Sequence, residues 1–214
     1  MKLYYVVGSP NCRKVMAVIN HLGIDIDLEY LDFFAGDLRN PAYLAVNANA
    51  MVPALRDGDF ALSESNAIMQ YLADMTPGQT LFPGERRARA DVVRWQCWEL
   101  AHFNKAFGTL AFETVAKPSF LKMEPDAARV RIALEDLARF APVLDAHLDG
   151  RQYAVGDGIT LADYSLIHIE QFKPLVAFDW SPYTHLNAYF DRMRAVPQWA
   201  KTAPPAMEAV GRRP

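Results

Sequence analysis

The spacing at which apolar residues recur changes once along the chain, and this change divides the sequence into two parts. Up to about residue 75, short alternating apolar runs are mixed with helical spacing, so both strands and helices are expected. From 88 onward nearly every apolar pattern has the helical period. The stretch 77–87 between them contains prolines and glycines that interrupt both periods. We therefore expect a mixed α/β domain at 1–76, a linker at 77–87 and an all-helical domain at 88–214, which suits a chain of this length.

The first part opens with a strand, a turn, a helix and a second strand. Residues 2–7 alternate apolar and polar side chains, and the letters GSPN at 8–11 predict a turn. From 13 to 22 the apolar residues recur at helical spacing, and Gly23 follows as a helix end would. Residues 26–30 alternate again. Two strands joined by a helix predict a parallel pair.

The same part then continues with a short helix, a hairpin and a longer helix. Residues 40–43 predict a helical turn that begins with proline. Residues 52–62 predict two antiparallel strands around the turn dipeptide Asp57-Gly58. We expect Ser65 to cap a helix that continues to Asp74.

The second part reads as helices throughout. Four are expected, at 88–115, 126–148, 164–172 and 183–195. Thr160 and Asp163 form a T-x-x-D capping box ahead of the third, and we assign both residues to folding and not to catalysis.

Composition and spacing exclude several classes of function. The formal net charge of −3 gives no basic surface, so nucleic acid is not expected as a partner. No apolar run reaches the roughly 20 residues of a membrane span, and the first residues are too short an apolar stretch for a secretory signal. The two cysteines and five histidines have no metal-ligand spacing. We expect a cytoplasmic protein that needs no metal and no membrane.

Several motifs, in order and with fitting gaps, resemble the cytosolic glutathione S-transferases, specifically bacterial, serine-type or theta/nu-like members. They are SPNCRKV, NPAYLAVN, MVPAL, LSESNAIMQYL and GDGITLADYS. The resemblance extends from the first strand to about Tyr189. It implies an α/β thioredoxin-like N-terminal domain that binds glutathione as a cosubstrate, followed by an all-α domain that lines a pocket for a small hydrophobic electrophile. It also implies a homodimer with a role in detoxification.

Within this resemblance, Ser9 has the position of the hydroxyl that hydrogen-bonds the glutathione thiolate. A thiol with a pKa of about 8.5 is mostly protonated at neutral pH, and a positioned donor favours its charged form. Asn11 is the alternative, because some bacterial members with a T-P-N turn bring an asparagine to the sulfur and act as disulfide reductases. Cys12 is expected to be a packed small residue, since Ser9 replaces the first cysteine of a C-x-x-C pair.

The resemblance also assigns the rest of the glutathione site. Glu64 suits the α-ammonium of the γ-glutamyl group, and Ser65 with the N–H groups of a helix N-terminus suits its α-carboxylate. Val52 would pair its backbone with the cysteinyl moiety, helped by a cis peptide bond to Pro53. Relatives usually carry a basic residue or glutamine directly before this pair, where the chain has Met51. Arg39, Asn49 or Lys14 could supply the missing contact, and the sequence does not choose among them.

The second substrate is less well defined by the sequence. Most of the aromatic residues on the helix at 88–115 have core spacing, so only Asn104 and Phe107 are put forward as electrophile contacts. The leading hypothesis is a transferase in which the glutathione thiolate attacks a hydrophobic electrophile. A glutathione-dependent disulfide reductase or peroxidase at the same site, and a non-enzymatic binding module, stay open as alternatives.

Overall fold

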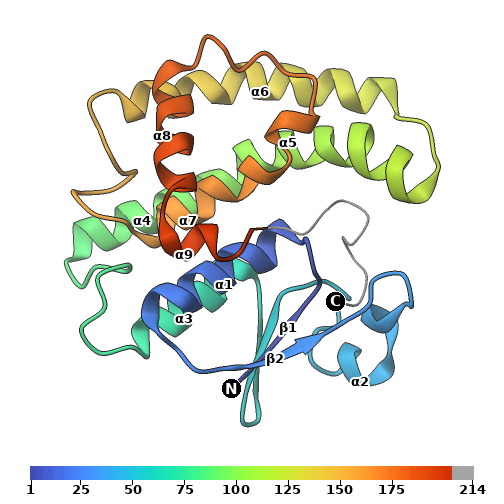
Figure 1. Ribbon diagram of the computed structural model, residues 1–214, viewed down its shortest axis with the longest axis vertical. Helices are drawn as coiled ribbons and strands as arrows, with labels where there is room; N and C mark the ends of the chain where they lie inside the picture. Colours follow the sequence, from blue (N-terminus) through green and yellow to red (C-terminus); the bar gives the residue numbers. More distant parts are fainter. Residues whose placement is uncertain (204–214) are drawn as a thin grey trace. The chain divides into compact units, whose positions relative to one another are not determined.

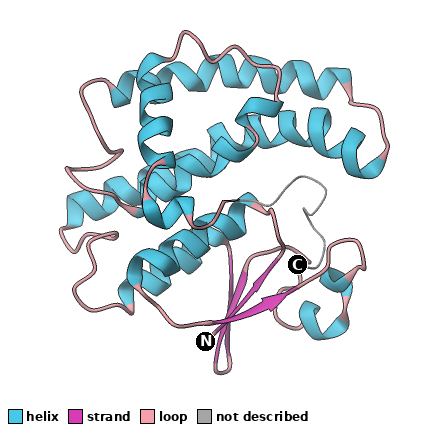
Figure 2. Ribbon diagram, viewed as in Figure 1, coloured by secondary structure: helices cyan, strands magenta, loops and turns pink. Residues whose placement is uncertain are grey.

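The computed structural model describes residues 1–203, and its contacts group the chain into two compact units. One unit comprises Met1–Phe82 together with the described residues from Val196, and the other comprises Pro83–Ala195. Among the described residues, the strands lie only in the first unit, and the second is built from helices and loops (Figure 2). The expected fold class, an α/β domain followed by an all-helical domain, is confirmed. The end of the predicted helical domain, 204–214, lies outside the described residues.

The first unit is a four-stranded sheet with helices. Its regular elements are β1 (Lys2–Tyr5), α1 (Pro10–Leu22), β2 (Asp27–Tyr30), the 3-10 helix η1 (Asp37–Arg39), α2 (Pro41–Leu44), β3 (Ala54–Asp57), β4 (Phe60–Ser63), α3 (Ser65–Asp74) and α9 (Pro197–Ala200). The strand order is β2-β1-β3-β4, in which β1 and β2 are parallel and the other neighbours are antiparallel. Helices α1 and α3 pack against each other, and α2 lies apart from them (Figure 1).

Helix α1 shows why the sequence folds as it does at this point. Ser9 is its N-cap in an extended conformation, and Pro10 occupies the first helical position, where its missing N–H costs nothing. Gly23 ends the helix with φ of 66°, a left-handed conformation that glycine adopts readily. The apolar face predicted from the spacing is buried, with Val15 and Val18 fully inaccessible.

The second unit contains the elements α4 (Arg86–Trp98), the π-helix η2 (Glu99–Phe103), α5 (Asn104–Ala111), the π-helix η3 (Phe112–Leu121), α6 (Ala127–Leu148), α7 (Leu161–Ile167), the 3-10 helices η4 (His168–Gln171) and η5 (Lys173–Leu175), and α8 (Thr184–Arg194). The predicted capping box is present: Asp163 accepts hydrogen bonds from the backbone N–H and hydroxyl of Thr160. Asp163 is fully buried and also accepts a hydrogen bond from the Tyr189 hydroxyl.

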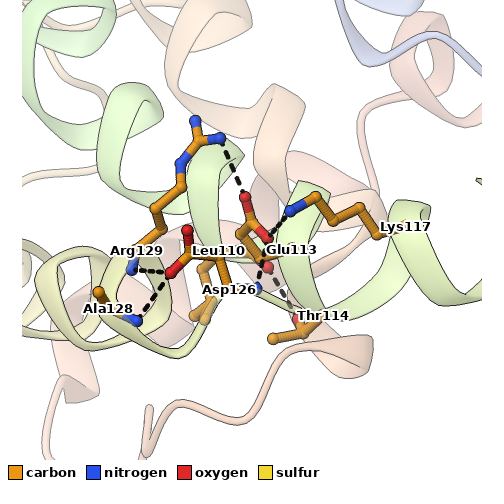
Figure 3. Close-up of polar contacts among 7 residues, drawn as sticks. All are labelled: Leu110, Glu113, Thr114, Lys117, Asp126, Ala128 and Arg129. Carbon is orange, nitrogen blue, oxygen red and sulfur yellow. Dashed lines mark hydrogen bonds and ion pairs between the residues drawn. The ribbon is translucent and has the colours of Figure 1, made fainter. Parts of the chain in front are cut away.

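The π-helix η3 is tied to the start of α6 by a buried carboxylate (Figure 3). Glu113 lies 2.5 Å from Lys117 Nζ and 3.2 Å from Arg129 Nη1, and it accepts the backbone N–H of Asp126 at 2.9 Å. Asp126 in turn caps α6 by accepting from two backbone N–H groups. One buried side chain therefore links the helix that contains Pro118 to the beginning of the next helix.

Two predictions in the first unit are wrong in detail. Ser65 does not cap α3: Glu64 is the N-cap, with φ of 70°, and Ser65 is the first helical residue. The chain turns at Glu64 itself, whose carbonyl accepts the first helical bond, from Ile68. The hairpin turn consists of Gly58 and Asp59, because β3 extends through Asp57 and Gly58 supplies the positive φ of 59°.

The helical predictions also need correction. The expected helix 88–115 is divided by the π-helical segment η2 and continues in η3 to Leu121, past Pro118. Helix α7 begins at Leu161 and gives way to a 3-10 helix at His168. The helix at 183–195 is not the last in the described chain, because α9 follows it.

The described residues lack two kinds of feature. No helix in residues 1–203 is both long and apolar enough to cross a membrane. The same residues contain no cluster of three or more histidine, cysteine, aspartate or glutamate side chains that could hold a metal ion.

Candidate glutathione site

The register of the sheet brings three separate segments to one end of it. Tyr4 of β1 lies opposite Ala54 of β3, and Ala54 also lies opposite Ser63 of β4. Because β3 is antiparallel to both neighbours, the chain leaves β1 toward Ser9, enters β3 from Pro53 and leaves β4 toward Glu64 at the same end. The sheet topology therefore gathers the residues that the sequence assigned to one site.

Ser9 stands between β1 and α1 with its side chain half-buried. Its Oγ accepts the backbone N–H of Cys12 at 3.3 Å, and its own carbonyl accepts the N–H of Arg13. The hydroxyl therefore caps the helix through a lone pair, while its O–H can still donate to another atom. It lies at the end of the helix where the backbone dipole favours negative charge.

Cys12 is buried in α1 directly below Ser9 and is not a candidate nucleophile. Burial raises the pKa of its thiol to about 11, although a hydrogen bond with the Ser9 side chain opposes this shift. The thiol is therefore protonated at neutral pH, which fits the expectation of a packed small residue.

The Val52-Pro53 peptide bond is cis, as the motif predicted. The backbone just before this bond is held by two side chains that were not predicted as site residues. The carbonyl of Met51 accepts hydrogen bonds from the Tyr43 hydroxyl and, at 2.8 Å, from Asn47 Nδ2. Burial raises the pKa of Tyr43 to about 12, so its hydroxyl stays a donor at neutral pH.

Tyr43 and Asn47 could have been found from the sequence. Both belong to the motif NPAYLAVN, of which residues 40–43 predict a helical turn, and a polar side chain a few residues before a turn in the backbone is a signal for such a bond. The side chain of Met51 is 67% exposed and takes no part in this network. The structure therefore separates the roles of this residue: its backbone is fixed, and its side chain points to solvent.

Glu64, Ser65 and Asn11 form the other side of the candidate site. Ser65 is buried at the first position of α3, where the first N–H groups have no acceptor within the helix. Its Oγ donates to Oδ1 of Asn11 at 3.4 Å, so the structure brings these two predicted residues together. Glu64 is exposed and its backbone lies in the left-handed region, which costs about 1–3 kcal/mol for a residue with a Cβ.

Arg39 lies earlier in the chain than Glu64 and Ser65, at the end of the 3-10 helix η1. Its side chain is exposed, and its backbone N–H donates to the carbonyl of Gly36. The preceding Leu38 packs in the hydrophobic cluster that also contains Tyr43, with Val52 packed against it. The loop that carries Arg39 is therefore anchored to the same cluster as the residue that precedes the cis-proline.

The two predicted electrophile contacts belong to the helical unit. Asn104 is the first residue of α5 and is half-buried, and its Oδ1 lies 3.0 Å from His168 Nε2. Phe107 is one turn farther along, is almost fully buried and packs against Trp180, with ring centroids 6.1 Å apart. In this structure Phe107 is thus a core residue, whereas Asn104 has an accessible side.

Two protein-family models match this chain. The model described as the N-terminal domain of glutathione S-transferase matches residues 3–80, and the one described as its C-terminal domain matches 103–197. The chain belongs to the glutathione S-transferase family. The family assignment made from the sequence motifs is therefore confirmed, and so is the thioredoxin-like nature of the first domain.

Similar proteins are found in plants, bacteria and insects. Glutathione S-transferase 3 of Zea mays is 33% identical over 210 residues, which cover 94% of this chain and 92% of that one. The crystal structure of glutathione transferase F7 from Populus trichocarpa has a TM-score of 0.87 at 25% identity, covering 94% of this chain and 97% of that one. The theta class transferase of Xanthomonas axonopodis pv. citri, solved with glutathione bound, has a TM-score of 0.86 at 28% identity and covers 96% and 98%. The bacterial, serine-type subclass stays a prediction.

Proposed function

We propose that this member of the family is a glutathione transferase in which Ser9 stabilises the glutathione thiolate for attack on a small hydrophobic electrophile. The observation that carries this proposal is the geometry of the Ser9 hydroxyl. It is fixed at the N-terminus of a 13-residue helix by the N–H of Cys12 and keeps its own hydrogen for a donor bond. A serine that served only as a cap would need none of the neighbouring residues that converge at this end of the sheet.

Glutathione, the cosubstrate, would lie along the three converging segments. Its γ-glutamyl carboxylate would meet the Ser65 hydroxyl and the first N–H groups of α3, and its ammonium group would meet Glu64. The cysteinyl backbone would pair with Val52, whose position is fixed through the Met51 carbonyl. Arg39 would approach the glycyl carboxylate, because its loop shares a hydrophobic anchor with Val52.

The reaction needs only a thiolate and an acceptor carbon. The bound thiol gives its proton to solvent, the thiolate sulfur attacks the electrophilic carbon, and a C–S bond forms as the leaving group departs with its electron pair. Lowering the thiol pKa by two units corresponds to about 2.7 kcal/mol. A hydrogen bond to a charged group contributes about 1.5–3 kcal/mol, and the helix dipole adds about 0.3–1 kcal/mol, so Ser9 and α1 together suffice.

The second substrate would contact Asn104, with Phe107 supporting the wall behind it. We also propose that the protein is a homodimer in the cytoplasm, as the family resemblance implies. The contact of Asn11 with Ser65 favours transfer over disulfide reduction, because it engages the Asn11 carbonyl oxygen at the γ-glutamyl end. A non-enzymatic module would have no need of the buried Ser65 or the left-handed Glu64.

Calorimetric binding of glutathione, followed by conjugation and disulfide-reduction assays on the same preparation, tests the proposal. Glu64→Ala should weaken glutathione binding about tenfold or more, because the ammonium group loses a charge-assisted bond of about 1.5–3 kcal/mol. Asp59→Ala, which removes an exposed carboxylate from the hairpin turn, should leave the affinity unchanged. If glutathione does not bind, or binds equally well to the Glu64→Ala protein, the proposed site is wrong.

A further inference from the structure

The interior of the helical unit contains a carboxylate and an imidazole that the proposed glutathione site does not use. Glu99, the first residue of the π-helix η2, is fully buried, and His168, the first residue of the 3-10 helix η4, is 2% exposed. Single π-helical turns inside helices are frequently found at functional sites. This one separates α4 from α5, and its last residue directly precedes Asn104.

The contacts of His168 determine its protonation state. Nδ1 lies 2.5 Å from the backbone carbonyl of Ser165, which can only accept a hydrogen bond, so Nδ1 must carry a hydrogen. Nε2 lies 3.0 Å from Oδ1 of Asn104 and 3.4 Å from Oε1 of Glu99. With the Asn104 amide in this orientation and Glu99 ionised, both of these oxygens act as acceptors and Nε2 carries a hydrogen as well. An imidazole with hydrogens on both nitrogens is an imidazolium.

The charge of Glu99 supports the same assignment. An ionised carboxylate in a protein interior is costly unless a cation and hydrogen bonds accompany it, and the imidazolium at 3.4 Å is such a cation. The rival arrangement rotates the Asn104 amide by 180°, so that its NH₂ donates to a neutral His168, and protonates Glu99. These two arrangements expose opposite ends of the Asn104 amide.

The orientation of Asn104 follows from this pair. Its Oδ1 is turned toward its own helix, where a Cβ added at Gly108 would lie 3.5 Å away. The amide is planar, so when Oδ1 is bound by His168 its two Nδ2 hydrogens point to the other side. Asn104 is half-buried, which leaves that side of its side chain accessible.

We propose that Glu99 keeps His168 as an imidazolium, and that His168 holds Asn104 so that its amide hydrogens face the second substrate. This inference rests on the proposed function, in which Asn104 contacts the electrophile. It names a substrate class: electrophiles that carry an oxygen acceptor, such as a nitro or carbonyl group, beside the reacting carbon. Glu99 and His168 are positioning residues, and only Asn104 touches the substrate.

The protonation state is measured directly by NMR of the wild-type protein with ¹⁵N-labelled histidine. At pH 7 one of the five histidines should show hydrogens on both ring nitrogens, and this signal should disappear in His168→Gln. In Glu99→Gln the same histidine should carry a single hydrogen, because the counter-charge is gone. A wild-type His168 with one ring hydrogen would overturn the inference, and this measurement needs no substrate.

The substrate class is measured as a ratio of kcat/KM values, for 1-chloro-2,4-dinitrobenzene over benzyl chloride, which lacks an oxygen acceptor. Asn104→Ala and Glu99→Gln should each lower this ratio about two- to tenfold, the size of one hydrogen bond. His168→Gln should lower this ratio less than Glu99→Gln does, because the glutamine amide can still donate a hydrogen bond to Asn104. Thr109→Val, on the same helix α5, should leave the ratio unchanged, since the threonine hydroxyl donates to the backbone carbonyl of Lys105.

An unchanged ratio in Asn104→Ala would overturn the assigned substrate class. If the wild-type protein conjugates neither halide, the proposed function itself fails, and the substrate class falls with it. The NMR result still decides the Glu99 and His168 assignment in that case, so the two failures are distinguishable.

Discussion

At the scale of single residues, Ser9 combines two roles that a sequence motif cannot separate. Its lone pair caps α1, and its hydrogen is directed to a bound sulfur in our proposal. Replacing Ser9 by alanine removes both roles, whereas glycine is nearly as good a cap as serine and cannot donate to a sulfur. A pair of variants can therefore distinguish a stabilising cap from a thiolate donor.

We expect Ser9→Ala and Ser9→Gly to raise the pKa of bound glutathione by about one to two units. Conjugation near neutral pH should fall about tenfold to a hundredfold in both, with little change in glutathione affinity. The thiolate absorbs in the near ultraviolet, so its titration is measured directly. Only Ser9→Ala should also lose about 1 kcal/mol of stability. An unshifted thiol titration in both variants would exclude Ser9 as the activating donor.

At the scale of elements, the contact between α1 and α3 links the proposed sulfur end of the site to its γ-glutamyl end. Asn11 and Ser65 lie in the first turns of these two helices, and one hydrogen bond joins them. A residue that positions Ser65 affects the affinity for glutathione, whereas a residue that touches the sulfur affects its pKa. Asn11 therefore has a role that kinetic measurements can assign.

A double-mutant cycle of Asn11→Ala and Ser65→Ala tests this role. Each single variant should weaken glutathione binding about two- to tenfold, and the double variant should be no worse than Ser65→Ala alone, because the two residues act through one bond. The thiol titration should stay unchanged in Asn11→Ala. Asn20→Ala, exposed on the same helix, is the matched control. If the losses of glutathione affinity were additive, or if Asn11→Ala shifted the pKa of the bound thiol, Asn11 would contact the sulfur, and the reductase alternative would be favoured.

The buried Glu113 makes a second element-scale prediction, on pH. Its bonds to the backbone of Asp126 and to Lys117 hold the pKa of this carboxyl below its ordinary value of 4.5. Because the folded-state pKa is lowered, the stabilisation is present above the unfolded pKa and is lost as the pH falls through the folded value. Glu113→Gln should therefore unfold at a lower urea concentration than the wild type at pH 7, and this difference should shrink below about pH 4.

Glu124→Gln, an exposed control, should unfold at the same urea concentration as the wild type at both pH values. A difference that persists at low pH would mean that packing, not charge, is lost.

The elements also show what a sequence can and cannot predict. Local patterns were sufficient for the strands, for α1 with Ser9 and Gly23, and for the capping box of Thr160 and Asp163, because each depends on neighbouring residues. The π-helices were missed because their hydrogen bonds differ from those of an α-helix by one residue, which barely alters the apolar spacing. The bonds of Tyr43 and Asn47 to Met51 depend on a turn of the backbone, and the Glu99 and His168 pair joins residues 69 positions apart.

At the scale of the whole molecule, the first unit is built from both ends of the chain. After the helical unit, the chain from Val196 returns to α1, and α9 packs against it. Trp199 is fully buried, the Arg13 guanidinium lies 3.9 Å from the centre of its ring, and Arg13 Nε donates to the Thr202 hydroxyl. Arg13 is one helical turn below Ser9, whose carbonyl accepts its N–H. The stability of α1 therefore depends on residues near the other end of the chain.

Trp199→Ala should accordingly destabilise the glutathione-binding unit, although Trp199 has no place in the proposed site. Truncating a buried tryptophan costs about 3–5 kcal/mol, which is a large part of the stability of a typical domain. Amide hydrogen exchange should rise most in α1, where the Arg13 stack is lost, and glutathione affinity should fall as α1 loosens. Lys201→Ala, exposed two residues later, should match the wild type in both measurements. If α1 stays as protected in Trp199→Ala as in the wild type, the returning segment covers α1 without stabilising it, and Ser9 is positioned by the sheet and its own helix alone.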